Sequence, residues 1–204
     1  MTVVEHPLVQ EALSRLRDAR TEPIEFRRSL GQASLLLGYE ATREFETRAA
    51  RVRTPLAAAR SLRLRRPILL VPILRAGLGL LPGLLQLLPQ ARVGLIGVRR
   101  HHRTLCATVY HKSLPADAGS SEILLIDPML ATGGSAIAAL GLLRRRGAKR
   151  MRLVSLVAAP EGIARVQRRF ADVSIITAAI DERLNDRGYI VPGLGDAGER
   201  LFGI

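Results

Sequence analysis

Short apolar runs recur along the middle of the chain, and stretches with helical periodicity separate them. The runs are residues 68–71, 93–98, 123–126, 153–157 and 173–177. Runs without regular polar alternation are typical of parallel strands that are buried on both faces. Residues 135–146 carry apolar positions at helical spacing, and Gly147 then provides a helix-stop signal. The pattern predicts an α/β fold with a parallel sheet flanked by helices.

Further elements are predicted on both sides of this region. Residues 7–19 and 25–45 have the pattern of helices, and the second of these is amphipathic. Residues 188–203 are rich in Gly and Pro and predict an ordered loop tail. No internal repeat or linker interrupts the sequence. We therefore expect a single domain over residues 1–204, with N-terminal helices and a C-terminal loop attached to the sheet.

The most apolar stretch, residues 67–89, is almost long enough to span a membrane. Pro72 and Pro82 would interrupt a helix there, and Arg75 would place a charge at the depth of the bilayer. This stretch therefore predicts a buried strand, a loop and a helix, and no membrane segment.

Composition is that of a folded cytosolic protein. Hydrophobic residues make up 48% of the chain and charged residues 24%, which excludes a disordered chain. A single cysteine, Cys106, excludes an internal disulfide and a zinc site with several cysteines. Residues 1–10 include Glu5 and lack the apolar segment of a signal peptide. We therefore expect a cytoplasmic location.

Positive charge is concentrated in three arginine-rich segments. The formal net charge is +13, and residues 43–66, 92–112 and 144–152 carry net charges of +6, +5 and +6. A basic protein attracts anions from phosphates to RNA, so the charge alone does not select a partner. The arginines at 144–146 predict a solvated helix end, where cations also suit the helix dipole.

Residues 101–106 contain two adjacent histidines and the cysteine. We interpret His101 and His102 as part of a mobile basic loop, because neighbours in sequence rarely bind one metal ion together. Cys106 lies in the same loop without a nucleophile motif around it, so an unreactive thiol is expected.

One segment has the composition of a phosphate-binding loop. An apolar run ends at Asp127, and Thr132, two glycines and Ser135 then lead into the predicted helix. Small residues at a helix N-terminus let backbone N–H groups converge on a phosphate, and an acid at the end of a strand can bind ribose hydroxyls. From spacing alone, an Asp-Pro turn followed by an ordinary helix cap accounts for the segment equally well. The absence of a following lysine excludes a nucleoside-triphosphate loop.

Three longer segments resemble the uracil phosphoribosyltransferase family, in the order in which that family has them. They are Val71-Pro-Ile-Leu-Arg-Ala-Gly-Leu-Gly79, Asp127-Pro-Met-Leu-Ala-Thr-Gly-Gly-Ser135 and Gly188-Tyr-Ile-Val-Pro-Gly-Leu-Gly-Asp-Ala-Gly198. The likeness covers nearly the whole chain. It implies a phosphoribosyltransferase-type fold and transfer of phosphoribosyl from 5-phospho-α-D-ribose 1-diphosphate (PRPP) to uracil, which gives UMP and diphosphate in pyrimidine salvage.

The resemblance implies a PRPP site with cations for the departing diphosphate. Arg75 and Arg100 would bind the diphosphate, Asp127 the ribose, and residues 131–135 the 5′-phosphate. The peptide bond before Arg75 is one that can be cis in this family. Arg75, Asp127 and Asp196 are the candidate catalytic residues. The implied PRPP-binding residues are Arg75, Arg100, Asp127, Pro128, Met129, Leu130, Ala131, Thr132, Gly133, Gly134, Ser135 and Asp196.

The tail would form the uracil site. By resemblance, Ile190, Gly195, Asp196 and Ala197 contact the base. Mg²⁺ is expected to enter as a complex with PRPP and to lie near Asp196, with no protein ligand assigned directly, since this hard ion takes mostly oxygen ligands from substrate and water.

The family resemblance also suggests GTP as an effector and a homodimer or larger homo-oligomer. Arginines at 48, 51 and 53, and the residues at 101–103, depart from the family pattern and put these two properties in doubt. Two alternatives keep the fold: an RNA-binding regulator of a pyrimidine operon, and a non-catalytic paralogue. Aromatic residues make up only 3% of the chain, which disfavours base stacking and makes nucleic acid a poor candidate partner.

Overall fold

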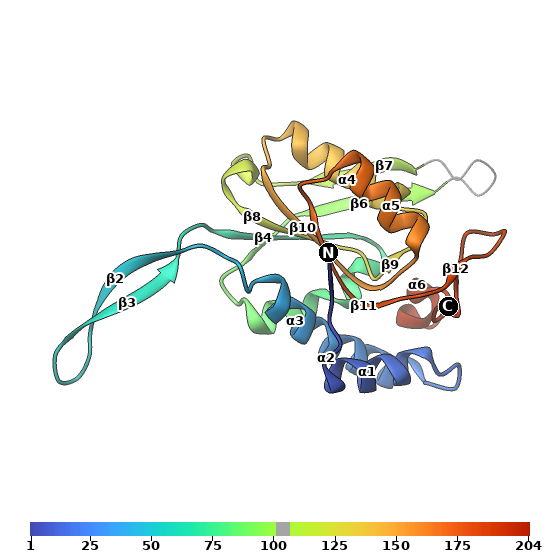
Figure 1. Ribbon diagram of the computed structural model, residues 1–204, viewed down its shortest axis with the longest axis horizontal. Helices are drawn as coiled ribbons and strands as arrows, with labels where there is room; N and C mark the ends of the chain where they lie inside the picture. Colours follow the sequence, from blue (N-terminus) through green and yellow to red (C-terminus); the bar gives the residue numbers. More distant parts are fainter. Residues whose placement is uncertain (101–106) are drawn as a thin grey trace.

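A nine-stranded sheet runs through the centre of the computed structural model, which describes residues 1–100 and 107–204 (Figure 1). Along the sheet the order is β1-β11-β10-β8-β4-β6-β7, with β5 paired to β4 and β9 paired to β10. Every pair is parallel except β6 with β7. The strands are β1 (Thr2–Val3), β4 (Ile68–Leu74), β5 (Arg92–Val93), β6 (Leu95–Arg100), β7 (Ala107–Ser113), β8 (Glu122–Ile126), β9 (Met129–Leu130), β10 (Arg150–Ala158) and β11 (Ser174–Ile180).

The five apolar runs all lie in this sheet, as predicted. Every residue of β8 and all but the last residue of β4 are buried, because helices cover both faces of the central strands. The run at 93–98 is not one strand, however. It divides at Gly94, whose N–H donates to Leu70 O over 2.9 Å, so that β5 and β6 both lie beside β4.

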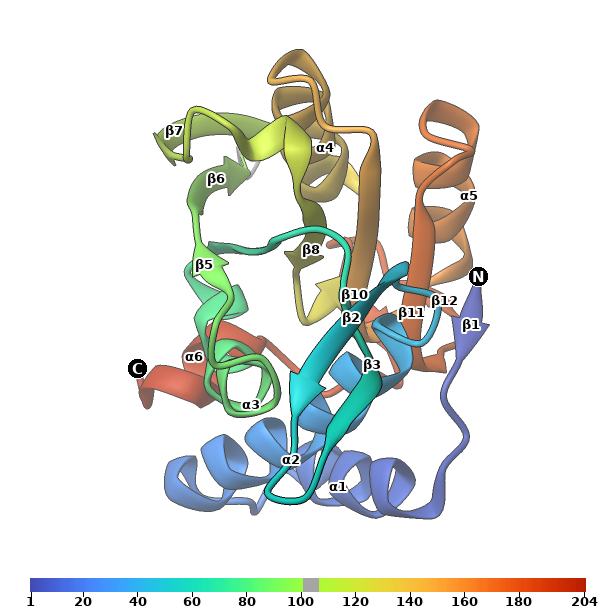
Figure 2. The same ribbon diagram turned by 90° about the vertical axis from the view of Figure 1, so that its left-hand side faces the viewer.

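Helices form a layer on each side of the sheet (Figures 1 and 2). One hydrophobic core joins α1, α2, α3 and α6 to one face, and a second core joins α4 and α5 to the other. The helices are α1 (Pro7–Arg17), α2 (Pro23–Ala41), α3 (Leu81–Leu87), α4 (Gly134–Arg145), α5 (Pro160–Arg169) and α6 (Ala197–Phe202), with 3₁₀ turns η1 (Ala76–Gly79) and η2 (Ala118–Ser120).

Two sequence predictions about helices need correction. The helix expected to reach residue 45 ends at Ala41, where the Thr42 hydroxyl donates to Gly38 O over 3.0 Å and caps the last turn. The tail expected as a loop contains β13 (Ile190–Val191), which pairs with β12 (Arg183–Leu184), and then α6. Leu194 and Leu201 of this tail are buried in the first core, so the tail is part of the packed body.

The stretch at 67–89 forms β4, η1 and α3, as predicted. In the described part of the chain, the search for a helix both long enough and apolar enough to cross a membrane finds none.

An antiparallel hairpin projects from the body and was not predicted (Figures 1 and 2). It consists of β2 (Thr47–Arg53) and β3 (Ala58–Leu64). Its base is fixed by Arg66, which lies 2.6 Å from a carboxylate oxygen of Glu46 and 3.7 Å from one of the buried Glu122. The hydrogen bond from Arg66 holds the pKa of Glu46 below its usual value.

Candidate active site

Several predicted site residues lie at one edge of the sheet. Pro72 of β4 lies opposite Ile126 of β8, so these parallel strands end side by side. Arg75 follows the end of β4, and Asp127 follows the end of β8. The backbone of Arg100 ends β6, which runs parallel to β4 on its other side. The structure therefore brings these three positions to the carboxyl edge, where open α/β sheets bind ligands.

The backbone of Asp127 is fixed on both sides. Its N–H donates to Val154 O over 3.1 Å, and its carbonyl accepts from the hydroxyl of Ser155 over 2.5 Å. Ser155 is fully buried, so the backbone that carries the Asp127 carboxylate is held rigidly at the end of the sheet. Sequence analysis missed Ser155, because one serine within an apolar strand carries no signal of its own.

The predicted phosphate loop ends at the N-terminus of α4. Gly133 is the residue before the helix and has a φ of 74°, a conformation that favours glycine. A Cβ at this position would also lie 3.0 Å from Gly162 O, at the start of α5. The N–H groups in the first turn of a helix have no helical carbonyl to bind. This loop therefore presents donors for an anion at the carboxyl edge of the sheet.

Residues of α5 support this loop from behind. Arg165 donates to Thr132 O over 3.2 Å. A Cβ on Gly162 would lie only 2.2 Å from Ala131 O, so the backbone of α5 packs directly on the loop. These contacts join positions far apart in sequence, and no local pattern in the sequence indicates them.

Arg75 lies between the sheet and the C-terminal helix. The peptide bond from Leu74 to Arg75 is cis, which confirms the expectation from the family resemblance. Arg75 is exposed, and its guanidinium lies over the ring of Phe202 at 5.9 Å from the centroid. Since α6 also packs against η1, the tail returns to the same edge of the sheet as Arg75.

The four predicted base-binding residues come from this tail. Ile190 and Ala197 are buried, Asp196 is half-buried and Gly195 is exposed. Asp196 is the N-cap of α6, and its Oδ1 accepts from the N–H groups of Gly198 and Glu199 over 2.8 and 3.0 Å. Gly195 has a φ of 80°, in the left-handed region.

Other residues singled out in the sequence are not assigned to the candidate site. His101, His102 and Cys106 lie outside the described residues. Among residues 1–100 and 107–204, no group of three or more His, Cys, Asp and Glu side chains is arranged to hold a metal ion. The arginines at 144–146 are exposed at the C-terminal end of α4, as predicted, and α4 begins at the phosphate loop.

Fold and site together define the class. A largely parallel sheet flanked by helices, with an acid and a glycine-containing loop after β8 and arginines at the ends of β4 and β6, has the fold of type I phosphoribosyltransferases. The adenine phosphoribosyl transferase of Trypanosoma brucei shares this fold with a TM-score of 0.58, at 16% identity, over 96% of this chain and 92% of that chain.

Closer relatives identify the family. A family model described as uracil phosphoribosyltransferase matches residues 3–204. The uracil phosphoribosyltransferase of Symbiobacterium thermophilum is 52% identical over 204 residues, which cover 100% of this chain and 98% of that protein. The AQ2163 protein of Aquifex aeolicus superposes with a TM-score of 0.95 and 38% identity, over 100% of this chain and 98% of that chain. The chain belongs to the uracil phosphoribosyltransferase family and is an enzyme of that class.

Proposed function

We propose that this enzyme transfers the phosphoribosyl group of PRPP to uracil and releases UMP and diphosphate. One observation carries the proposal: the Asp127 loop, Arg75 and the C-terminal tail meet at one edge of the sheet. A phosphate-binding loop, a cation and a separate tail loop are the three parts that joining a base to a phosphorylated sugar requires. Family membership supplies the identity of the base.

In the proposed mechanism the chain mainly binds and orients charge. The N–H groups at the start of α4 hold the 5′-phosphate, and Asp127 holds the ribose hydroxyls. Displacement at the anomeric carbon passes through an oxocarbenium-like state while negative charge grows on the diphosphate. By resemblance to the family, Arg75 and Arg100 stabilise that charge, and donors that are fixed before the reaction do so most effectively.

Uracil is read by the tail. Backbone groups near Ile190, Gly195 and Ala197 face the edge of the base, which has a donor at N3 between two carbonyl acceptors. Cytosine has an unprotonated N3 and an exocyclic amine there. Cytosine thus exchanges one donor and one acceptor position of uracil. Fixed backbone groups cannot reorient to match this exchange, and each buried group left unpaired costs about 1–3 kcal/mol.

Mg²⁺ fits the residues at this edge as an ion carried by PRPP. The carboxylates of Asp127 and Asp196 are hard oxygen donors, and Asp196 Oδ1 is already bound by two backbone N–H groups. The second oxygen of Asp196 is the proposed contact to the ion. When bound, Mg²⁺ neutralises part of the charge of the diphosphate.

Four other features remain predictions. The single-domain organisation and the cytoplasmic location are predicted from the sequence pattern and composition. GTP as an effector and the homo-oligomeric state are predicted from the family resemblance. The hairpin supports the last of these, because Leu56 at its tip is 97% exposed and Leu62 is 68% exposed. An assembly that covered these leucines would remove their apolar surface from water.

The proposed function is tested by incubating the purified chain with uracil, PRPP and Mg²⁺ and measuring UMP. We expect turnover with uracil, and a kcat/KM for cytosine lower by at least ~10³. A chain that binds PRPP without forming UMP would be the non-catalytic paralogue. Comparable values for uracil and cytosine would contradict reading of the base by fixed backbone groups.

A further inference from the structure

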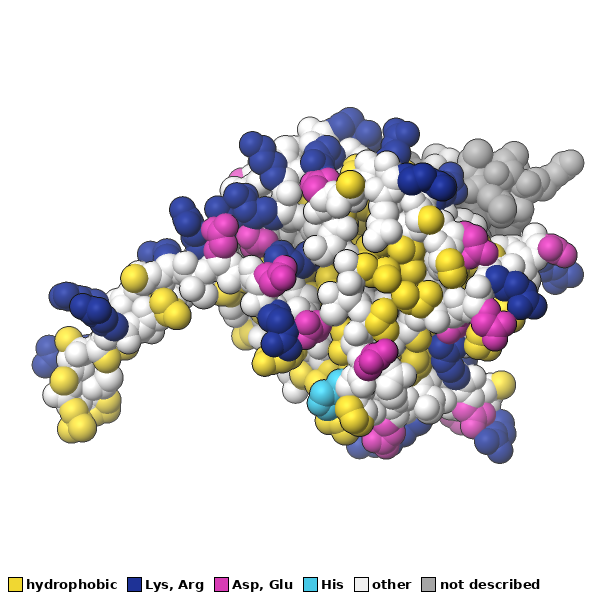
Figure 3. Space-filling view, viewed as in Figure 1, with side chains coloured by type: hydrophobic (Ala, Val, Ile, Leu, Met, Phe, Trp, Pro, Cys, Tyr) yellow, Lys and Arg dark blue, Asp and Glu magenta, His cyan; other side chains and the backbone are white. Residues whose placement is uncertain are grey.

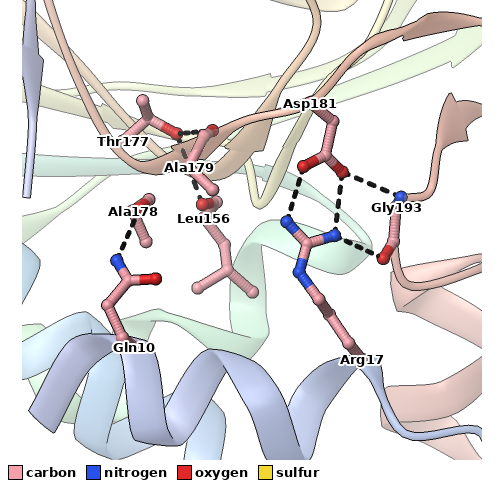
Figure 4. Close-up of polar contacts among 8 residues, drawn as sticks. All are labelled: Gln10, Arg17, Leu156, Thr177, Ala178, Ala179, Asp181 and Gly193. Carbon is pink, nitrogen blue, oxygen red and sulfur yellow. Dashed lines mark hydrogen bonds and ion pairs between the residues drawn. The ribbon is translucent and has the colours of Figure 1, made fainter. Parts of the chain in front are cut away.

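A partly buried ion pair connects the first helix to the tail loop (Figure 4). Arg17, the last residue of α1, donates to both carboxylate oxygens of Asp181 over 2.9 and 2.5 Å. The same guanidinium donates to Gly193 O over 2.7 Å, and Asp181 Oδ2 accepts from Gly193 N–H over 2.8 Å. Arg17 and Asp181 therefore hold both backbone polar groups of Gly193.

Asp181 is itself rigidly supported. It follows β11, its N–H donates to Ala158 O over 2.9 Å at the end of β10, and its side chain is only 4% exposed. A buried carboxylate is stable only when its partners are present and well aligned. A paired, two-pronged contact with arginine has this geometry and restricts both partners.

Gly193 is the turn between the predicted base contacts. It lies between Ile190 and Gly195, has a φ of 58°, and would place a Cβ only 2.2 Å from Ile190 O. The loop can therefore make this tight turn only with glycine, which leaves Asp181 and Arg17 to fix its position.

A second arginine ties the same loop to α1. Arg200 of α6 donates to Leu194 O over 3.0 Å, to Asp18 O over 2.6 Å and to Leu16 O. Burial lowers the pKa of Arg200 from the usual arginine value, and its guanidinium lies over the ring of Phe26 at 4.5 Å. The C-terminal end of α1 is thus bound to two successive residues of the tail: to Gly193 through Arg17, and to Leu194 through Arg200.

We propose that Arg17 and Asp181 are positioning residues for uracil: they set the position of the tail loop without touching the substrate. This inference rests on the proposed function. Binding groups act fully only within a fraction of an ångström of the productive geometry. Loss of the pair should therefore weaken uracil binding and base selection. PRPP binding should change little, because the Asp127 loop follows β8 and Asp196 is held separately, as the N-cap of α6, by the N–H groups of Gly198 and Glu199.

The experiment compares Asp181→Asn and Arg17→Met with the wild-type enzyme and with Arg15→Met. Arg15 lies on the same helix and pairs with Glu11 on the surface, so it is a matched control without a contact to the tail. We expect KM for uracil to rise by ~10-fold or more, because a displacement of binding groups by about 1 Å can cost as much as ~10²-fold. KM for PRPP should stay within about twofold, and the preference for uracil over cytosine should fall.

Two further variants keep the test decisive. Arg17→Lys retains the charge without the two-pronged contact and should give an intermediate KM for uracil, even where Asp181→Asn folds poorly. The double variant should resemble the worse single variant, because residues that act as one unit are not additive. Equal increases in both KM values, or no change in uracil KM in folded variants, would overturn the inference. Wild-type protein that forms no UMP would overturn the proposed function as well.

Discussion

Arg75 shows how one side chain is prepared for charge that develops during a reaction. It follows a buried strand that pairs with the strand before Asp127. Arg75 is exposed, and its described aromatic contact is the ring of Phe202. The ring orients the guanidinium only weakly, because a cation–π contact contributes about 0.5–1 kcal/mol at exposed sites. The guanidinium can therefore still bind an incoming anion. The sequence indicated Arg75 through its place in a family motif. It could not indicate the contact with Phe202, which depends on the return of the tail.

We expect Arg75→Ala to lower kcat by ~10²–10³, because the contact strengthens as diphosphate departs. Arg144→Ala is a matched control, since Arg144 also lies 5.9 Å from a ring centroid, that of Phe170, but at the far end of α4. The measurement is steady-state UMP formation at saturating uracil and PRPP. Similar losses in both variants would show that Arg75 acts through folding rather than through the leaving group.

At the scale of elements, α6 combines a structural role with a proposed ligand role at one residue. Asp196 caps the helix through two N–H groups, and the same carboxylate is the proposed contact to Mg²⁺ and PRPP. The two roles have different chemical requirements. A cap needs an oxygen acceptor, which asparagine also provides, whereas a contact to Mg²⁺ favours a negative charge.

Asp196→Asn and Asp196→Ala therefore separate the two roles. Asp196→Ala should lower the free energy of unfolding by about 0.5–2 kcal/mol, and Asp196→Asn should leave it nearly unchanged. Both variants should bind the Mg²⁺ complex of PRPP more weakly. Denaturant unfolding and calorimetric titration with PRPP measure the two effects. Full PRPP binding by the asparagine variant would contradict the proposed contact to the ion.

Elements with a buried face were predictable, and those without one were not. The sheet strands appear as apolar runs because both of their faces are covered. The hairpin was missed because β2 and β3 mix arginines with small and apolar residues without regular alternation, and neither strand contains a buried residue. The helix α6 was hidden by the Gly and Pro around it, although Asp196 followed by Glu199 at the third position is a capping signal. The contact of Arg17 with Asp181 joins residues 164 positions apart and has no local signal.

Over the whole molecule, many of the basic side chains lie on the hairpin and at the C-terminal end of α4, away from the carboxyl edge of the sheet. Figure 3 shows Lys and Arg side chains along the hairpin and over much of the body. On the hairpin, Arg48 lies opposite Arg63, and Arg51 lies opposite Arg60. Like charges directly opposite each other destabilise a strand pair. These arginines are therefore a cost to the hairpin unless anions or an assembly compensate for them.

Neutralising arginines that lie away from the carboxyl edge of the sheet separates the enzyme from the RNA regulator. Replacing the arginines at 48, 51, 53 and 144–146 by glutamine should leave kcat/KM for uracil within about twofold of wild type, because exposed ion pairs such as that of Arg144 with Asp172 contribute little. Retention of RNA at low salt should fall, and wild-type retention should fade steeply as salt rises, as contacts with phosphates alone do. Filter binding across a salt series, run beside the UMP assay on the same preparations, measures both. If RNA binding is sequence-specific, persists at physiological salt and is lost together with these arginines, the RNA regulator becomes the better-supported function and the enzyme the alternative.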